Sequence, residues 1–187
     1  MRPARTALAL VVLALVLRAA YAAYGIANPD SRWQELDPDR YIEHGAMFVR
    51  DGGWRWTLES VVFRDGAAGF VKSPLYQVFL SVFARFTPDY PKYAPLGHDA
   101  LGAVTTAAVF LLASALHSTR AGIIAGAIHA TWLVSIVSVM GFWQEQLYIP
   151  LFALATAWCV RSFDTPRDET RAGVTLALAA LTRSMPL

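Results

Sequence analysis

The residues of this sequence that best suit chemistry are two carboxylates two positions apart, Asp37 and Asp39, within residues 36–41. Carboxylates at the start of a helix can take a proton from a hydroxyl group or bind a divalent cation. The same residues also suit helix capping, because Asp37 precedes Pro38 and an acid near a helix N-terminus is stabilised by the helix dipole. These residues alone leave both interpretations open.

Three more charged side chains stand beside apolar segments. Lys72 precedes Pro74 at a predicted helix start, where an ammonium group can meet a phosphate, although an interfacial lysine reaching water is the alternative. Glu145 lies at the end of an apolar segment, as a site acid or a solvated helix cap. Arg183 lies inside an apolar run, where an unpaired guanidinium is costly.

Other familiar chemistry is absent from the sequence. The four histidines share no metal-ligand spacing, and His129 is predicted to be a packed, hydrogen-bonded residue. Glycine-rich nucleotide loops, the serine-hydrolase elbow and the zinc-protease motif are missing. The single Cys159 excludes an intramolecular disulfide. A net charge of +2 without a run of Lys or Arg argues against a nucleic-acid partner.

The composition indicates an integral membrane protein. Of the 187 residues, 56% are hydrophobic and 16% are charged, and the mean hydropathy is +0.40. Soluble domains carry about 45–50% apolar and about 25% charged residues. The apolar residues are gathered into blocks, which excludes a disordered chain, a coiled coil and a disulfide scaffold.

The blocks predict membrane-spanning helices. A span needs roughly 20 apolar residues. Four complete spans are expected at about residues 6–24, 96–116, 121–140 and 146–160, and a fifth begins near residue 172 and continues to 187. Because Arg18 interrupts the first block and further spans follow, we interpret this block as an uncleaved signal anchor rather than a removed signal peptide.

The basic residues of the short loops predict the orientation. Such residues favour the cytoplasmic side. Arg5, Arg120 and the arginines of the 161–171 loop all fall on that side if residues 27–94 form one long outer loop. We therefore expect a multi-pass protein of the cell membrane with a cytoplasmic N-terminus.

The outer loop contains two amphipathic stretches. One covers residues 41–48. In the other, apolar side chains recur at helical spacing, at positions 75, 78, 79, 82, 83 and 86. This second helix is too short to span and is expected to lie along the membrane surface. The predicted fold is thus a single all-α domain over residues 1–187: a polytopic transmembrane helical bundle with interfacial helices in its outer loop.

Taken in order, these pieces resemble the N-terminal part of GT-C class membrane glycosyltransferases, the group that includes family 39 protein mannosyltransferases and bacterial aminoarabinose transferases. Asp37 and Tyr41 match the D-x-x-x-Y of the first outer loop. Residues 72–75 (Lys-Ser-Pro-Leu) resemble K/H-P-P-L, with serine in place of the first proline. Three later features are also similar: residues 98–105 with His98 near the usual arginine, the outer-end acid Glu145, and residues 178–183.

This resemblance implies an inverting glycosyltransferase that moves a sugar from a polyprenyl-phosphate donor to a lipid, glycan or protein acceptor on the outer face. The family is longer, so the chain is expected to be an N-terminal fragment that is inactive alone. The implied roles are a base at Asp37, a second acid at Glu145, substrate or phosphate contacts at Lys72, Arg183, Tyr41 and His98, and a divalent Mg or Mn ion near Asp39.

Two other classes compete with the transferase. The first is a non-catalytic integral membrane protein, such as a transporter subunit or an inactive remnant. The predicted polar groups cluster at outer span ends rather than at mid-membrane, which argues against a transporter. The second is an acyltransferase-like enzyme, and the sequence lacks a paired His/Asp motif to support it.

Overall fold

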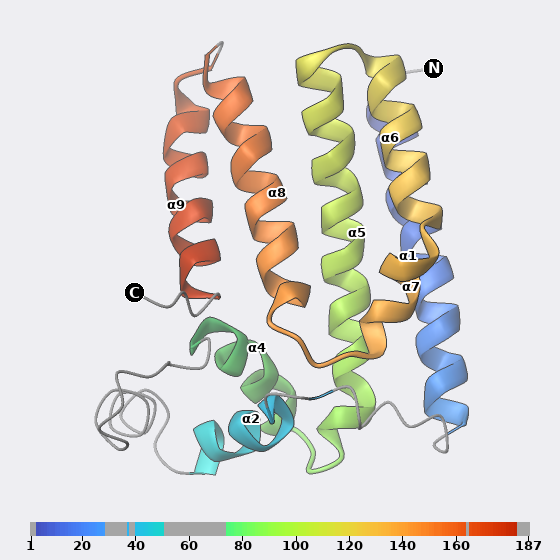
Figure 1. Cartoon of the computed structure of the whole chain (residues 1–187), viewed down its shortest axis with the longest axis vertical. Helices are drawn as coiled ribbons and strands as arrows, with labels where there is room; N and C mark the ends of the chain where they lie inside the picture. The colour runs from blue at the N-terminus through green and yellow to red at the C-terminus, as the bar shows by residue number, and fades with distance from the viewer. Residues whose placement is uncertain (1–2, 29–36, 38–39, 51–73, 164, 183–187) are drawn as a thin grey trace.

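The computed structural model describes residues 3–28, 37, 40–50, 74–163 and 165–182, and all regular structure within these residues is helical (Figure 1). The all-α prediction is thus confirmed for them. The helices are α1 (Pro3–Ala27), α2 (Tyr41–Arg50), α4 (Pro74–Ala84), α5 (Tyr90–Leu116), α6 (Thr119–Thr131), α7 (Leu133–Val137), the 3-10 turn η2 (Ser138–Met140), α8 (Glu145–Ser162) and α9 (Arg167–Leu181).

The long helices run side by side as a bundle. α5 packs against α1, α6 and α8, and α9 packs against α8. Figure 1 shows the N-terminus, the α5–α6 turn and the α8–α9 connection at one end, and α2 and α4 at the other. We name the first the basic end, because five described arginines lie there: Arg5, Arg120, Arg161, Arg167 and Arg171. The other is named the aromatic end.

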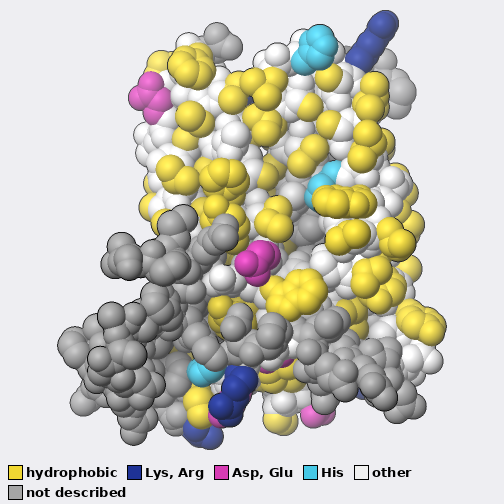
Figure 2. Space-filling view, viewed as in Figure 1, with side chains coloured by type: hydrophobic (Ala, Val, Ile, Leu, Met, Phe, Trp, Pro, Cys, Tyr) yellow, Lys and Arg dark blue, Asp and Glu magenta, His cyan; other side chains and the backbone are white. Residues whose placement is uncertain are grey.

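Two helices are long and apolar enough to cross a membrane: α1, over Ala4–Ala27, and α5. They contain the predicted spans 6–24 and 96–116. Hydrophobic side chains cover most of the bundle surface in Figure 2. The predicted spans 146–160 and 172–187 fall in α8 and, as far as Leu181, in α9. α5 starts at Tyr90, inside the predicted outer loop, because Pro91 suits the first turn of a helix.

The predicted third span, residues 121–140, is not one straight helix. It divides at Trp132 into α6 and the α7–η2 pair, which are bent by 53° and together count as at most one span. The buried Arg18 of α1 accounts for the break. Its guanidinium donates to the carbonyls of His129 (3.2 Å) and Ala130 (3.4 Å) and to Ser135 Oγ (2.7 Å). The carbonyls that the break frees are therefore satisfied from another helix.

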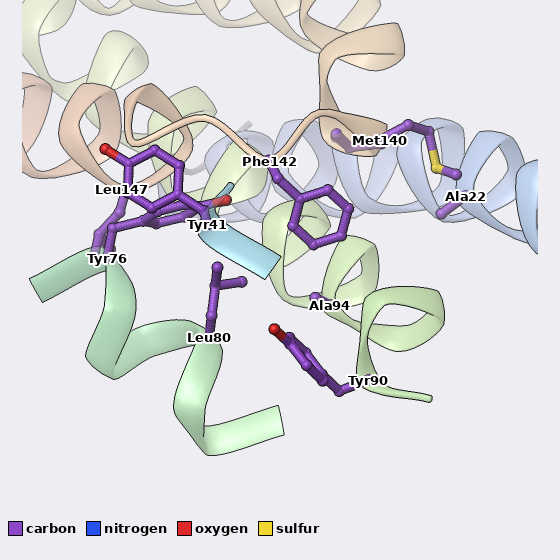
Figure 3. Close-up of a cluster of buried hydrophobic side chains, with 10 residues drawn as sticks. Ala22, Tyr41, Tyr76, Leu80, Tyr90, Ala94, Met140, Phe142 and Leu147 are labelled. Atoms are coloured by element: carbon purple, nitrogen blue, oxygen red, sulfur yellow. The ribbon is translucent and has the colours of Figure 1, made fainter. Parts of the chain in front are cut away.

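A cluster of aromatic and aliphatic side chains forms the core of the aromatic end (Figure 3). α2 and α4 approach closely at Gly45, where a Cβ atom would lie 2.9 Å from Leu80 Cβ. The buried residues of α4 are Tyr76, Gln77 and Leu80. The apolar residues that recur at helical spacing in the sequence are therefore not all buried: the last of them, Phe86, is 82% exposed.

Candidate functional site

Asp37 lies at the start of α2 and holds its first turn. The carboxylate accepts the backbone N–H of Tyr41 at Oδ1 (2.7 Å) and that of Ile42 at Oδ2 (2.8 Å). The backbone N–H of Arg40 donates to the carbonyl of Asp37, and Arg40 has a φ of 58°, which is uncommon for a residue with a side chain. Asp37 thus bonds to the start of α2, as the capping interpretation predicts, although α2 begins at Tyr41 rather than at Pro38. The role of Asp37 as a base stays a prediction.

Tyr41 connects α2 to the start of α8. Its ring is buried, and its hydroxyl donates to Gln144 Oε1 at 3.1 Å, across 103 positions of sequence. Gln144 directly precedes Glu145, which is exposed in the first turn of α8. Asp37 and Tyr41, which one sequence motif singles out, and Glu145, which a second feature singles out, therefore belong to one connected region of the aromatic end.

Tyr76 of α4 stands at the centre of this region. The side chain is fully buried, and its ring meets the edge of Tyr41 with centroids 4.9 Å apart. Figure 3 shows both tyrosines beside Leu147 of α8. The Tyr76 hydroxyl lies 3.1 Å from Nε2 of His98 in α5. α2, α4, α5 and α8 thus all contribute to the surroundings of one phenol.

His98 has a definite tautomer in this arrangement. Its Nδ1 lies 2.7 Å from the carbonyl oxygen of Val139, and a carbonyl can only accept, so Nδ1–H is the donor. Nε2 then accepts the hydroxyl proton of Tyr76. The ring is fully buried between Phe79 and Phe142. In the described residues His98 therefore positions Tyr76 and bonds to η2, and its predicted contact with a substrate phosphate stays a prediction.

The electrostatics of Tyr76 link it to both candidate acids. Burial raises the pKa of the Tyr76 hydroxyl well above its ordinary value, and the negative charges of Asp37 and Glu145 raise that pKa further. The phenol therefore stays neutral and serves as a hydrogen-bond donor. One signal in the sequence could have identified Tyr76: it directly follows the Lys-Ser-Pro-Leu stretch at residues 72–75.

A cavity of about 230 Å³ adjoins the site between α5, the bent α6–α7 pair and α8. Most of its wall is apolar, and Glu145 and Gln146 belong to the lining. His129 lines it too, and its Nδ1 is 2.9 Å from Thr106 Oγ1, in agreement with the prediction of a hydrogen-bonded histidine. The bend at Trp132 makes one wall of this cavity, which a straight third span would lack.

Three predicted site residues lie outside the described part of the chain: Asp39, Lys72 and Arg183. The expected Mg or Mn ion would be held by Glu145 together with Asp37 or Asp39. Among the described residues, no group of three or more His, Cys, Asp or Glu side chains is arranged to hold a metal ion. The bound ion therefore stays a prediction.

Comparison with protein-family models, curated proteins and solved structures finds no match to this chain. The resemblance to GT-C glycosyltransferases therefore rests on the sequence motifs alone, and the activity is treated as a proposal.

Proposed function

We propose that the chain carries the site of a membrane glycosyltransferase that moves a sugar from a polyprenyl-phosphate carrier to an acceptor hydroxyl. One observation supports this proposal most directly. Asp37 and Tyr41 come from one motif of the resemblance and Glu145 from another, and all three lie around Tyr76 at one end of the bundle.

The proposed reaction is a displacement at the anomeric carbon of the donor sugar. The acceptor oxygen forms a bond to that carbon while the bond to the carrier phosphate breaks, and the phosphate leaves with the electron pair. Asp37 is proposed to take the acceptor proton, and Glu145 to act as the second acid. Lys72 and Arg183 are proposed to neutralise the departing phosphate.

The position of the cavity supports a lipid-linked donor. The cavity has an apolar wall that includes Trp132, Val134 and Ile149, and Glu145 contributes to the same lining. A cavity of this kind suits an isoprenoid chain whose phosphate meets the polar site. The carrier would reach the site from within the membrane, beside two helices long enough to span it.

The proposal includes a multi-pass arrangement. α1, α5, α6 with α7–η2, α8 and α9 would all cross the bilayer, with the basic end in the cytoplasm and the aromatic end outside. Its support is that the five arginines of the basic end lie together, as the positive-inside rule requires. The interfacial helices α2 and α4 would then cover the site at the outer surface.

The test is a transfer assay with a radiolabelled sugar on a polyprenyl phosphate, using the membrane-reconstituted full-length protein of which this chain is expected to be the N-terminal part. We expect Asp37→Asn to lower the transfer rate about 10²–10⁴-fold, the usual value of general-base catalysis. Asparagine has one acceptor oxygen and keeps one of the two bonds to α2, so the loss of stability should be no more than about 1 kcal/mol. The matched control is Glu169→Gln, an exposed acid of α9 at the basic end.

Two outcomes would contradict the proposal. If Asp37→Asn keeps its transfer rate while its melting temperature falls, Asp37 is a cap and has no catalytic role. If the unaltered full-length protein transfers no sugar from any polyprenyl carrier, the competing class of a non-catalytic membrane protein gains support.

A further inference from the structure

We propose that a second site, at the basic end of the bundle between α5 and α8, binds the phosphate of an anionic phospholipid. A cavity of about 330 Å³ opens there. Leu111, Ser114 and Ala115 of α5 form one wall, and Arg161 of α8 and Thr165 form the other. This cavity shares no lining residue with the one beside Glu145, and the inference does not depend on the proposed transferase activity.

Arg161 is oriented in this cavity by contacts on its other side. Its Nε donates to Oδ2 of the fully buried Asp168 at 3.2 Å, and its guanidinium lies 5.5 Å from the ring centroid of Trp158. Asp168 also accepts from Arg171 at 2.7 Å. Within the described residues, the two Nη groups of Arg161 make no hydrogen bond, so they can form the paired N–H···O contacts that arginine offers a phosphate.

The remaining lining suits a lipid better than a free ion. Thr165 brings a hydroxyl group to this lining, while the buried Ser114 hydroxyl faces Gly122 of α6. Leu111 and Ala115 bring apolar surface at the same level, and the side chain of Phe163, next in the chain after α8, is 88% exposed. A phosphate diester with attached acyl chains has this division into a charged and an apolar part.

The charge of the basic end favours an anionic headgroup. Five described arginines lie there, against the two described acids Asp168 and Glu169. Basic pockets between membrane helices are typical binding sites for anionic lipid headgroups. One basic residue near such a headgroup is worth about fivefold in affinity.

The experiment is native mass spectrometry of the full chain in detergent, titrated with phosphatidylglycerol or with phosphatidylcholine of the same acyl chains. We expect the unaltered chain to bind phosphatidylglycerol at least about fivefold more tightly. Arg161→Gln should remove that preference. The matched control, Arg167→Gln, alters an exposed arginine that does not line the cavity and should keep it.

A second variant keeps the proposal falsifiable, because Arg161→Gln also breaks a contact to buried Asp168. Ala115→Trp fills the cavity and leaves that ion pair intact, and it should lower phosphatidylglycerol binding to the phosphatidylcholine level. Unchanged lipid preference in Ala115→Trp would overturn the inference, whatever Arg161→Gln does. Displacement of the lipid by millimolar inorganic phosphate would also overturn it, because the site would then take the free ion.

Discussion

Arg18 of α1 lies against Gly102 of α5 so closely that a Cβ atom at position 102 would be 2.5 Å from Arg18 Nε. The guanidinium fills the space that the missing side chain leaves, and it also interacts electrostatically with the buried Asp99 of α5. The same guanidinium bonds to the α6–α7 break. One glycine therefore permits the contact that shapes the wall of the cavity beside Glu145.

Gly102→Ala is expected to destabilise the chain by about 1–3 kcal/mol, the usual cost of overpacking a filled interior. Thermal unfolding in detergent measures it. Gly173→Ala in α9 is the control, because no atom lies within 4 Å of a Cβ there. Alanine in an exposed helix should be neutral or stabilising. Equal melting temperatures for the two variants would show that Arg18 does not need the space at Gly102.

Asp168→Asn is expected to lower stability by about 1–3 kcal/mol, because a buried acceptor loses its charge while two arginines lose their partner. Thermal unfolding is again the measurement, and Glu169→Gln supplies the comparison at an exposed neighbour of the same helix. A loss of the same size in both variants would mean that the cluster of Arg161, Asp168 and Arg171 contributes nothing specific.

Tyr76 should stay un-ionised in the folded chain at a pH where exposed tyrosines titrate, near 10. Its pKa is raised in the folded state, so the folded chain keeps a proton that the unfolded chain releases. That contribution to stability is present below pH 10 and is lost as the pH rises further. Stability should therefore fall more steeply above pH 10 in the unaltered chain than in Tyr76→Phe.

Absorbance at the phenolate band measures this directly. The folded chain and Tyr76→Phe should show the same ionisation curve until the unaltered chain unfolds. A step near pH 10 that disappears in Tyr76→Phe would contradict the burial of this hydroxyl.

The sequence could predict those parts of the fold that depend on local pattern. Apolar blocks of about 20 residues identify α1 and α5, and the 3.6-residue spacing identifies α4. The break at Trp132 could not be predicted, because its cause is Arg18, more than a hundred positions away. The buried face of α4 could not be predicted from the sequence either, because it depends on how α2 packs against α4 at Gly45.

The residues of the candidate site likewise include some that the sequence could predict and some that it could not. Spacing relative to Tyr41 identified Asp37, and a charge at the end of an apolar block identified Glu145. Tyr76 was missed because a tyrosine at a membrane surface is ordinary in sequence. The hydrogen bonds of the His98 ring could not be predicted, because one of them goes to the carbonyl of Val139. Residues 138–140 form η2, which follows the bend at Trp132.

The proposed orientation can be tested by cysteine labelling. In a Cys159→Ser background, a cysteine replacing Arg50 of α2 should react with an impermeant maleimide in intact cells. A cysteine replacing Arg167 of α9 should react only after permeabilisation. Both positions are exposed, so accessibility across the membrane decides the result. The reverse pattern would place the candidate site in the cytoplasm.

The bond between Arg18 and the α6–α7 break also has a consequence for biosynthesis. The acceptors of this guanidinium lie 111 and 112 positions further along the chain. At roughly 5–20 residues per second, the ribosome completes them about 6–22 s after Arg18 itself. In the proposed membrane arrangement, α1 would until then hold in the bilayer a charge worth about 3 kcal/mol of insertion penalty. We therefore expect α1 to stay beside the insertion machinery until the segment that contains α6 and α7 has been synthesised.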